Sequence, residues 1–210
     1  MRVSVVIPAL NEESCIERAV SSAWTSGASE VVVVDGGSRD STCRCAAAAG
    51  ARVLSSPPGR AVQQNVGARS CVGEVLLFLH ADCRLPEDGV AQIDEALGDS
   101  AVVGGSFRQR IEAEGWLYRC LERGNSWRAG RRQLPYGDQG LFVRRATYEA
   151  AGGFPEVPLM EDVMLARSLR KMGQLRLVEG PLRVDARRWQ AGGVIRQTLR
   201  NRCLLWAWRL

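Results

Sequence analysis

Polar side chains with the chemistry to bind a metal ion or an anionic ligand follow an apolar segment near the middle of the chain. Residues 75–79 form an unbroken apolar run without helical period, which indicates a strand buried on both faces, and His80 and Asp82 come directly after it. Side chains at positions i and i+2 of an extended backbone point the same way, so His80 and Asp82 could share one metal ion or one ligand oxygen. The alternative is structural: Asp82 would cap the turn and His80 would be satisfied at the strand end.

Strand-like and helix-like segments alternate through the first half of the chain. Pro8 closes the first predicted strand, and Asn11 and Asp40 are predicted to cap the helices that follow the first two strands. This alternation predicts an α/β fold, a mostly parallel sheet with helices on both faces. The Gly-rich phosphate loops of dehydrogenases and P-loop enzymes do not occur. The predicted strands are 3–8, 30–35, 51–54 and 75–79, and the predicted helices are 12–26, 40–50 and 59–70.

The ends of these strands carry polar residues. Asn11 and Glu12 follow the first strand, Asp35 ends the second, and His80 and Asp82 follow the fourth. Because parallel strands bring their carboxyl ends to one edge of a sheet, we expect these residues to form a rim for a nucleotide. The carboxylate of Asp35 could accept a hydrogen bond from a base N–H or a ribose hydroxyl.

Composition limits the classes of protein to consider. With 46% hydrophobic and 24% charged residues, the 210 residues fit one globular domain with a sizeable core. The seven cysteines are scattered and form no Cys-x-x-Cys pair, which argues against a disulfide framework or a zinc site and favours a reducing cytoplasm. We find neither a signal-peptide pattern nor an apolar run of transmembrane length. The net charge of +5, carried almost wholly by arginine, suits an anionic ligand, an acidic membrane or nucleic acid.

The chain resembles glycosyltransferase family 2 over residues 1–86. The resemblance is carried by Val-Ser-Val-Val-Ile-Pro-Ala-Leu-Asn-Glu-Glu at 3–13, by Val-Val-Asp-Gly-Gly-Ser-Arg-Asp-Ser-Thr at 33–42, and by the predicted strand that ends in His-Ala-Asp at 80–82. The family has the GT-A fold, binds a nucleoside diphosphate sugar and inverts the anomeric centre. The small size and the His-Ala-Asp motif look most like the small bacterial branch of selenodomain-associated, or arsenosugar-type, glycosyltransferases.

The resemblance implies a metal-dependent enzyme with a nucleotide-sugar site. The family's metal motif is usually Asp-x-Asp, and its last Asp corresponds to Asp82, so Mg²⁺ or Mn²⁺ held by Asp82 would neutralise the leaving diphosphate. His80 departs from the motif and is the second candidate metal ligand. A UDP-sugar is expected as donor rather than a GDP-sugar. The residues expected to bind the donor are Pro8, Asn11, Glu12, Asp35, Arg60, Asn65, Ala81, Asp82, Asp138 and Gln139.

The predicted helix 59–70 resembles the family segment that packs beside the nucleotide. Gly59 opens this helix, whose N-terminal N–H groups could face anions. Arg60 could reach the diphosphate and Asn65 could orient the base or the ribose. The neighbouring Gln63 and Gln64 could be only a solvated face of the helix.

The second half should bind the acceptor and supply the catalytic base. Gly137 and Gly140 bracket Asp138 and Gln139, which could hydrogen-bond sugar hydroxyls, although turn-forming glycines explain the pattern equally well. The Met-Glu-Asp segment at 160–162 resembles the family's Glu-Asp motif at a helix start, which makes Asp162 the base that takes the acceptor proton, with Glu161 as its neighbour. Both acids could instead only complement the helix dipole. Further strands are predicted at 102–110, 141–143 and 182–184, and further helices over 116–127, from 145 and from 161.

The predicted organisation is a nucleotide-binding half (1–86), an acceptor and catalytic half (87–190) and a C-terminal helix (191–210). The Arg-Arg-Trp segment at 187–189 resembles part of the Gln-x-x-Arg-Trp motif of processive enzymes, but Val184 stands at the Gln position, which argues against a polymer synthase. The basic, Trp-bearing helix 194–210 could bind an anionic membrane or pair in a homodimer. The acceptor is a small molecule or lipid-linked, and no nucleic acid partner is expected. The alternatives are a nucleotidyltransferase and a non-catalytic nucleotide- or membrane-binding module.

Overall fold

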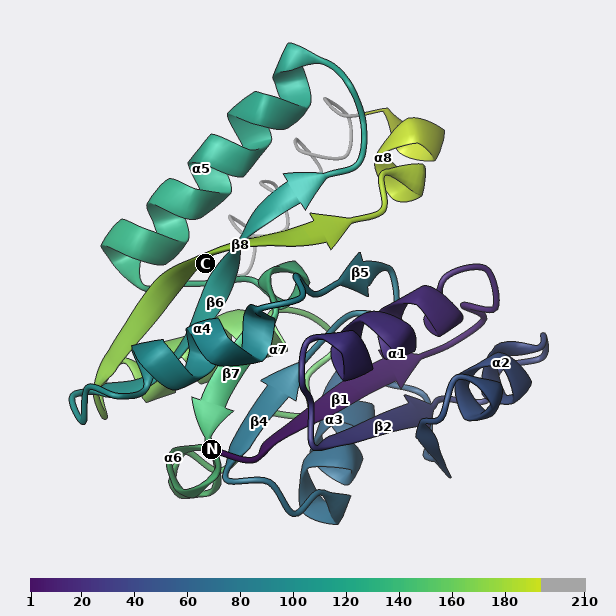
Figure 1. The fold of residues 1–210 in the computed structure, drawn as a ribbon, viewed down its shortest axis with the longest axis horizontal. Helices are drawn as coiled ribbons and strands as arrows, with labels where there is room; N and C mark the ends of the chain where they lie inside the picture. Colours follow the sequence, from purple (N-terminus) through teal and green to yellow (C-terminus); the bar gives the residue numbers. More distant parts are fainter. Residues whose placement is uncertain (194–210) are drawn as a thin grey trace.

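A mixed eight-stranded sheet organises the computed structural model, which describes residues 1–193 (Figure 1). Its strand order is β3-β2-β1-β4-β7-β6-β8-β5. The strands are β1 (Val3–Ala9), β2 (Glu30–Asp35), β3 (Arg52–Ser55), β4 (Val75–Phe78), β5 (Cys83–Arg84), β6 (Val102–Ile111), β7 (Leu141–Arg144) and β8 (Gln174–Val184). The helices are α1 (Ile16–Thr25), α2 (Thr42–Ala48), α3 (Arg60–Ser70), α4 (Gly89–Ala96), α5 (Trp116–Arg132), the 3-10 turn η1 (Gly137–Gln139), α6 (Arg145–Ala150), α7 (Glu161–Leu169) and α8 (Arg187–Gly192). The predicted helix 194–210 lies outside the described residues.

The α/β class predicted from the sequence is confirmed, with one reversal in the sheet. The pairs β3-β2, β2-β1, β1-β4 and β6-β8 are parallel. Strand β7 lies between β4 and β6 and runs antiparallel to both, and β5 runs antiparallel to β8. The alternation of strands and helices could not reveal this reversal, because the direction of a strand depends on the end of the sheet at which the preceding segment enters it.

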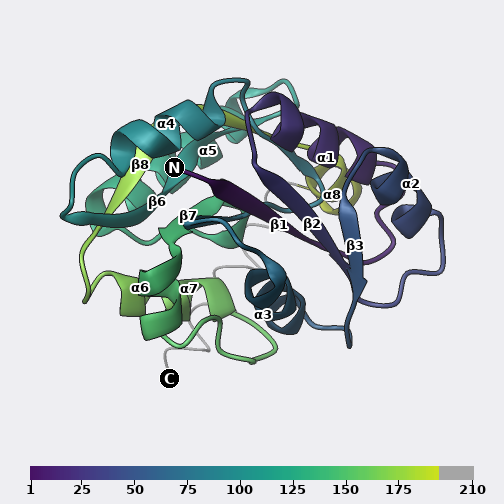
Figure 2. The ribbon, with the colours of Figure 1, turned by 60° about the horizontal axis from the view of Figure 1, so that its bottom comes forward.

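Two apolar layers hold the sheet between its helices (Figure 2). Helices α1, α2 and α4 cover one face, and α3, α6 and α7 cover the other. The strands β1, β2 and β4 are buried almost throughout, which explains their unbroken apolar sequences. No described helix has the length and hydropathy to span a bilayer.

Two predicted boundaries near the start of the chain are wrong. Strand β1 continues through Pro8 to Ala9, and the ring is tolerated because pairing with β4 ends at Val6, which leaves Pro8 a neighbour on one side only. Asn11 does not cap a helix: α1 begins at Ile16, and Asn11 has a left-handed φ of 54°. Its side-chain oxygen instead accepts the N–H of Arg39 at 2.9 Å, which ties the loop after β1 to the loop after β2.

Asp40 contributes to a helix start in a different way from the one predicted. The cap position of α2 is Ser41, and the Asp40 carboxylate accepts the N–H of Thr42 at 3.0 Å, the first residue of the helix. Asp40 therefore supports the first turn of α2 from one residue further out.

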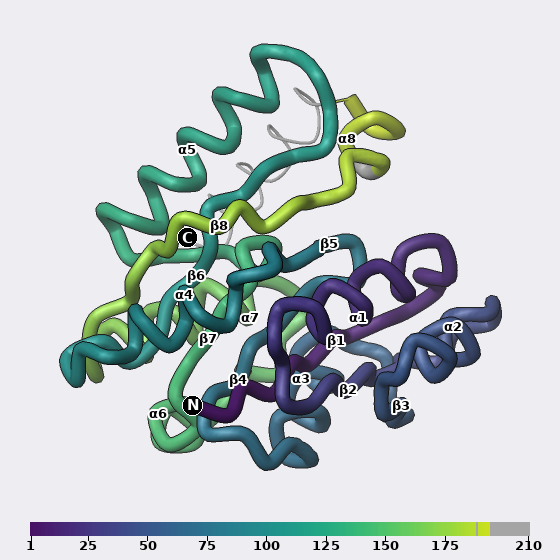
Figure 3. Tube along the Cα trace, in the orientation of Figure 1, coloured from purple at the N-terminus to yellow at the C-terminus, as the bar shows by residue number. Residues whose placement is uncertain are grey.

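Close approach of three strands requires glycine in β6. A Cβ on Gly104 would lie 2.4 Å from the carbonyl oxygen of Phe142 in β7, and one on Gly105 would lie 2.0 Å from that of Arg176 in β8. The absence of a side chain at both positions therefore permits the close approach of the three backbones. Figure 3 traces β6 and β8 side by side, although most of the second half of the chain separates them in sequence. This pairing brings the end of β8 to the carboxyl edge of the nucleotide-binding half.

Candidate functional site

A cleft of about 360 Å³ opens where β1 and β4 end. The carboxyl ends of parallel strands are where open α/β folds bind ligands, so the cleft has the expected position. Four residues predicted to bind the donor and one predicted metal ligand line it. The lining residues are Pro8, Ala9, Leu10, Glu12, Gly59, Arg60, Gln63, His80 and Ala81.

Gln63 joins the two strands that form the floor of this cleft. Its amide nitrogen donates to the carbonyl oxygens of Ala9 and Val34, each at 2.8 Å. The interpretation of Gln63 and Gln64 as a solvated face is wrong, because both side chains are buried. A lone polar residue on a predicted helix gives no signal of such a bridge, since its partners lie on β1 and β2.

Asp35 lies at the same edge of the sheet, and its carboxylate is hydrogen-bonded within the turn that follows β2. The carboxylate accepts the N–H of Gly37 at 3.0 Å and the N–H and hydroxyl of Ser38. Burial alone would raise the pKa of the Asp35 carboxyl, but these hydrogen bonds outweigh burial and hold the pKa below its ordinary value of 3.8. Asp35 is therefore ionised and rigid.

Asn65 does not face the cleft. Its side-chain oxygen accepts from the Tyr148 hydroxyl at 2.6 Å and from the Phe154 N–H at 3.0 Å, and its amide donates to the Phe154 carbonyl at 2.8 Å. The prediction that Asn65 orients the base or ribose is contradicted by this geometry. Asn65 instead fastens α3 to the loop that leads toward α7.

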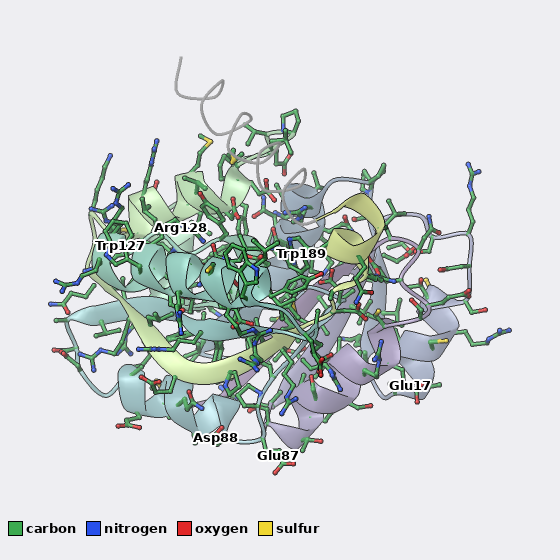
Figure 4. The ribbon with its side chains drawn as sticks, turned by 90° about the horizontal axis from the view of Figure 1, so that it is seen from above. Glu17, Glu87, Asp88, Trp127, Arg128 and Trp189 are labelled. Carbon is green, nitrogen blue, oxygen red and sulfur yellow. The ribbon has the colours of Figure 1, made fainter. Side chains whose placement is uncertain are left out.

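Glu12 is ion-paired with Arg187 of α8. The N–H of Glu12 donates to the Thr42 hydroxyl at 2.8 Å, and Arg187 also donates to the Ser14 hydroxyl at 2.7 Å. Trp189, on the same short helix, turns inwards onto the core (Figure 4). The end of the described chain is thus fastened to the loop after β1, beside the cleft.

His80 and Asp82 diverge instead of pointing the same way. The strand ends at Phe78, and the N–H of Cys83 donates to the carbonyl of His80 at 3.0 Å, so the chain turns between the two side chains. His80 lines the cleft, whereas Asp82 lines a separate cavity of about 10 Å³, the size of a single water or ion. The prediction that the two share one metal ion is wrong for this arrangement, because it assumed an extended backbone.

Asp185 is an acid beside Asp82 that the sequence interpretation missed. Its N–H donates to the Asp82 carbonyl at 3.0 Å, and Asp82, Glu112 and Asp185 all line the small cavity. The sequence signal was present, because Asp185 follows the predicted strand 182–184 just as Asp35 and Asp82 follow theirs. Only the pairing of β8 with β6 and β5 brings it here.

The cavity combines carboxylates with two arginines, because Arg18 pairs with Asp185 at 3.4 Å and Arg84 pairs with Glu112. A Mg²⁺ or Mn²⁺ ion held by Asp82 and Asp185 would therefore compete with Arg18 for the Asp185 carboxylate. Carboxylate oxygens are the ligands that such hard cations prefer, and Mg²⁺ is commonly held by one or two carboxylates together with substrate phosphates. Among residues 1–193, no three acidic, histidine or cysteine side chains are grouped closely enough to hold a cation alone. A cation held by Asp82 and Asp185 would therefore need water and substrate oxygens to complete its shell.

The two acids of α7 lie next to the cleft. Glu161 is buried, and its carboxylate lies 3.3 Å from the guanidinium of Arg60, a cleft residue. Burial, reinforced by the charge of Asp162, raises the pKa of Glu161 against the opposing effect of Arg60. Asp162 accepts the N–H of Gly137 at 2.6 Å and the N–H of Val163 at 2.7 Å. The first turn of α7 thus presents two carboxyl groups with different partners.

Gly137 is the point at which His80 and Asp162 meet. A Cβ at Gly137 would lie 2.8 Å from Nε2 of His80 and 3.5 Å from Oδ2 of Asp162, so a larger residue here would displace the His80 ring. The next two residues carry buried polar atoms that lack a hydrogen-bond partner among the described residues, Oδ1 of Asp138 and Nε2 of Gln139. Such atoms are costly unless a ligand or water satisfies them. This loop therefore has capacity to bind a polar ligand.

Arg128 of α5 fixes that loop. Its guanidinium stacks 3.3 Å from the centre of the Tyr136 ring and donates to Gln139 Oε1 at 2.9 Å, to the Leu134 carbonyl at 3.0 Å and to Asn125 Oδ1 at 2.8 Å. Burial lowers the pKa of Arg128, opposed by the charges of Tyr136, Asp138 and Asp162. The sequence of α5 does not indicate this contact, because Leu134, Tyr136 and Gln139 lie beyond the helix.

Residues 4–149 match the model of the family described as Glycosyl transferase family 2. The chain belongs to glycosyl transferase family 2. No curated protein matches it. Three acids of this family 2 chain near the cleft and the small cavity, Glu161, Asp162 and Asp185, lie beyond the matched residues, so their roles depend on the geometry.

Solved structures share the fold of this family 2 chain. The mannosyltransferase PcManGT from Pyrobaculum calidifontis, in complex with GDP-Man and Mn²⁺, superposes with a TM-score of 0.67 at 24% identity, over 88% of this chain and 56% of that one. S. aureus TarS 1-349 gives 0.65 at 18%, over 89% and 61%. Glucosyl-3-phosphoglycerate synthase from Mycobacterium tuberculosis, in complex with Mn²⁺, UDP and glucosyl-3-phosphoglycerate, gives 0.58 at 22%, over 88% and 70%. The predicted GT-A fold is confirmed, and the chain spans about three fifths of the first two structures.

Proposed function

We propose that this family 2 chain transfers a sugar from a nucleoside diphosphate sugar to a hydroxyl acceptor, with inversion at the anomeric carbon. The observation that carries the proposal is the junction between the cleft and α7. Arg60 lines the cleft and pairs with Glu161, and the next residue, Asp162, is held by the N–H of Gly137 beside His80. A binding site for an anion and a candidate base are therefore adjacent.

Donor binding is assigned to the cleft and its rim. Arg60 begins α3 directly after Gly59, so the guanidinium and the free N–H groups of the first turn suit a diphosphate. The ionised Asp35 is assigned to the base or ribose. The orphaned atoms of Asp138 and Gln139 are assigned to sugar hydroxyls, because hydroxyls both donate and accept.

The metal is assigned to Asp82 and Asp185. When bound there, Mg²⁺ or Mn²⁺ supplies positive charge against which the diphosphate can leave. His80 is assigned to the donor sugar side, next to Gly137, rather than to the metal. The solved mannosyltransferase and synthase structures are complexes with Mn²⁺, which supports a divalent cation.

Asp162 is assigned as the general base. The acceptor oxygen attacks the anomeric carbon from the face opposite the diphosphate, its proton passes to the Asp162 carboxylate, and the bond from the anomeric carbon to the diphosphate oxygen breaks. The two N–H groups that Asp162 accepts hold its carboxylate in one orientation. Glu161, whose pKa is raised, is assigned to positioning Arg60.

Finer expectations belong to the same proposal. The donor is a UDP-sugar, the compartment is the cytoplasm, and the acceptor is a small molecule or is lipid-linked. The His-Ala-Asp motif resembles the selenodomain-associated, or arsenosugar-type, branch of the family. Membrane binding or dimerisation through 194–210 stays a prediction from the sequence.

The experiment is calorimetric titration with UDP- and GDP-sugars, with and without Mn²⁺, followed by measurement of donor hydrolysis and transfer. We expect Mn²⁺-dependent binding of one nucleotide class and slow hydrolysis of its sugar. Binding without turnover of any nucleotide sugar would make the chain a binding module, and absence of binding would contradict the assigned cleft.

A further inference from the structure

Helix α5 (Trp116–Arg132) exposes one face along its whole length. The side chains of this face, which we call the α5 stripe, follow helical spacing of i, i+4, i+7, i+11 and i+15. Trp116 is 72% exposed and Trp127 is 55% exposed, which is unusual for so large an apolar side chain. The α5 stripe consists of Trp116, Cys120, Arg123, Trp127 and Arg131.

The inner face of α5 is polar, the reverse of an ordinary surface helix. Glu122 is buried and accepts the N–H of Ile111 at 2.6 Å, and Asn125 donates to Gln109 of β6 at 2.7 Å. Ala129 is the one buried apolar residue among those of the helix. The tryptophans therefore do not pack in the core, and their outward position indicates a binding partner outside the chain.

The charge of this face is positive. Arg123, Arg131 and the adjoining Arg132 are exposed, and the guanidinium of Arg132 lies 4.9 Å from the centre of the Trp127 ring. The single acid of the helix, Glu122, is buried and paired with Arg119 at 2.9 Å. The face thus presents apolar rings and cations together.

We propose that the α5 stripe binds the surface of a membrane containing anionic phospholipids. Tryptophan suits the boundary between headgroups and acyl chains, and arginine suits phosphate. A second copy of the same face would oppose arginine with arginine, which disfavours a dimer through this surface. Single-stranded nucleic acid is bound in positively charged grooves, whereas the α5 stripe is the convex side of a helix.

The position of α5 gives this surface a functional meaning. Arg128 on the side of the same helix holds the loop of Asp138 and Gln139 through Tyr136 and Gln139. A membrane bound to the α5 stripe would therefore lie at a fixed orientation to the candidate active site, as an acceptor embedded in that membrane requires.

The test is co-sedimentation of the full chain with vesicles of phosphatidylcholine, with or without phosphatidylglycerol. We expect binding only to the anionic vesicles, weakening as salt rises. Replacing Arg123 and Arg131 with Gln should weaken binding by about fivefold per residue. The double variant Trp116→Ala/Trp127→Ala should weaken it at least tenfold with an unchanged melting temperature, because both side chains are exposed. Trp24→Ala is the matched control, since Trp24 is 39% exposed on α1, which Figure 1 places apart from α5.

Three outcomes would overturn the proposal. The first is no binding to anionic vesicles at low salt. The second is loss of binding in Trp206→Ala/Trp208→Ala but not in Trp116→Ala/Trp127→Ala, which would place the contact in the segment after residue 193. The third is tighter binding of a short single-stranded oligonucleotide than of vesicles, lost in the Arg123→Gln/Arg131→Gln variant.

Discussion

Replacing Arg128 with Met should loosen the loop that presents the candidate base. Met keeps much of the length of the side chain but removes every hydrogen bond of the guanidinium, so Gln139 Oε1, the Leu134 carbonyl and Asn125 Oδ1 each lose a donor. An acceptor left unpaired in a buried site costs about 1–3 kcal/mol, and the substitution recovers part of the cost of burying a guanidinium. We expect a net loss of about 2–4 kcal/mol in the free energy of unfolding.

The assay is thermal unfolding together with donor binding and donor turnover. A loss of this size should lower the melting temperature by about 5–15 °C. Because Gly137 belongs to the loosened loop and donates to Asp162, turnover should fall by up to about 10²-fold. Donor affinity should fall less than turnover, since this loop is assigned to the sugar hydroxyls and not to the diphosphate. Arg131→Met is the matched control, since Arg131 lies on the same helix and is exposed. If both variants melt at the same temperature and turn over alike, Arg128 does not hold the loop.

Three further predictions concern the assigned site. Asp162→Asn should lower transfer by ~10²–10⁴ with donor affinity unchanged, and a tenfold loss of donor affinity would reassign Asp162 to donor binding. Asp82→Asn and Asp185→Asn should each remove the Mn²⁺-dependent part of nucleotide affinity, and equal Mn²⁺ dependence in either variant would exclude that residue from the metal site. Asp35→Asn should weaken nucleotide binding and flatten acid unfolding. Because the folded pKa of Asp35 is lowered, its stabilisation is present above the ordinary value of 3.8 and is lost as pH falls through the folded value, so unchanged acid unfolding would contradict the hydrogen-bonded turn.

The sequence predicted well those features that depend on local pattern. The apolar runs of β1, β2 and β4 indicated buried strands, because burial on both faces of the sheet favours an apolar residue at successive positions of a strand. Their polar ends indicated the cleft edge, and Pro8, Glu12, Arg60, His80 and Ala81 do line it.

Features that depend on distant contacts could not be predicted. The sequence predicted that Asn65 contacts the nucleotide, whereas its side chain accepts hydrogen bonds from Tyr148 and Phe154 in the structure. His80 and Asp82 diverge because β4 stops two residues before His80, a difference too small for a sequence pattern to define. Asp185 reaches Asp82 only through strand pairings across most of the chain.

The ion pair between Glu12 and Arg187 links the two ends of the described chain energetically. Glu12 lines the cleft, and α8, which carries Arg187, leads directly into the residues after 193. If a donor binds best when this pair is open, anything that binds the end of the chain and favours the open pair will raise donor affinity, and the donor will strengthen that second interaction by the same factor. Binding at the end of the chain would then regulate donor binding in the cleft, and donor binding would in turn strengthen binding at the end of the chain.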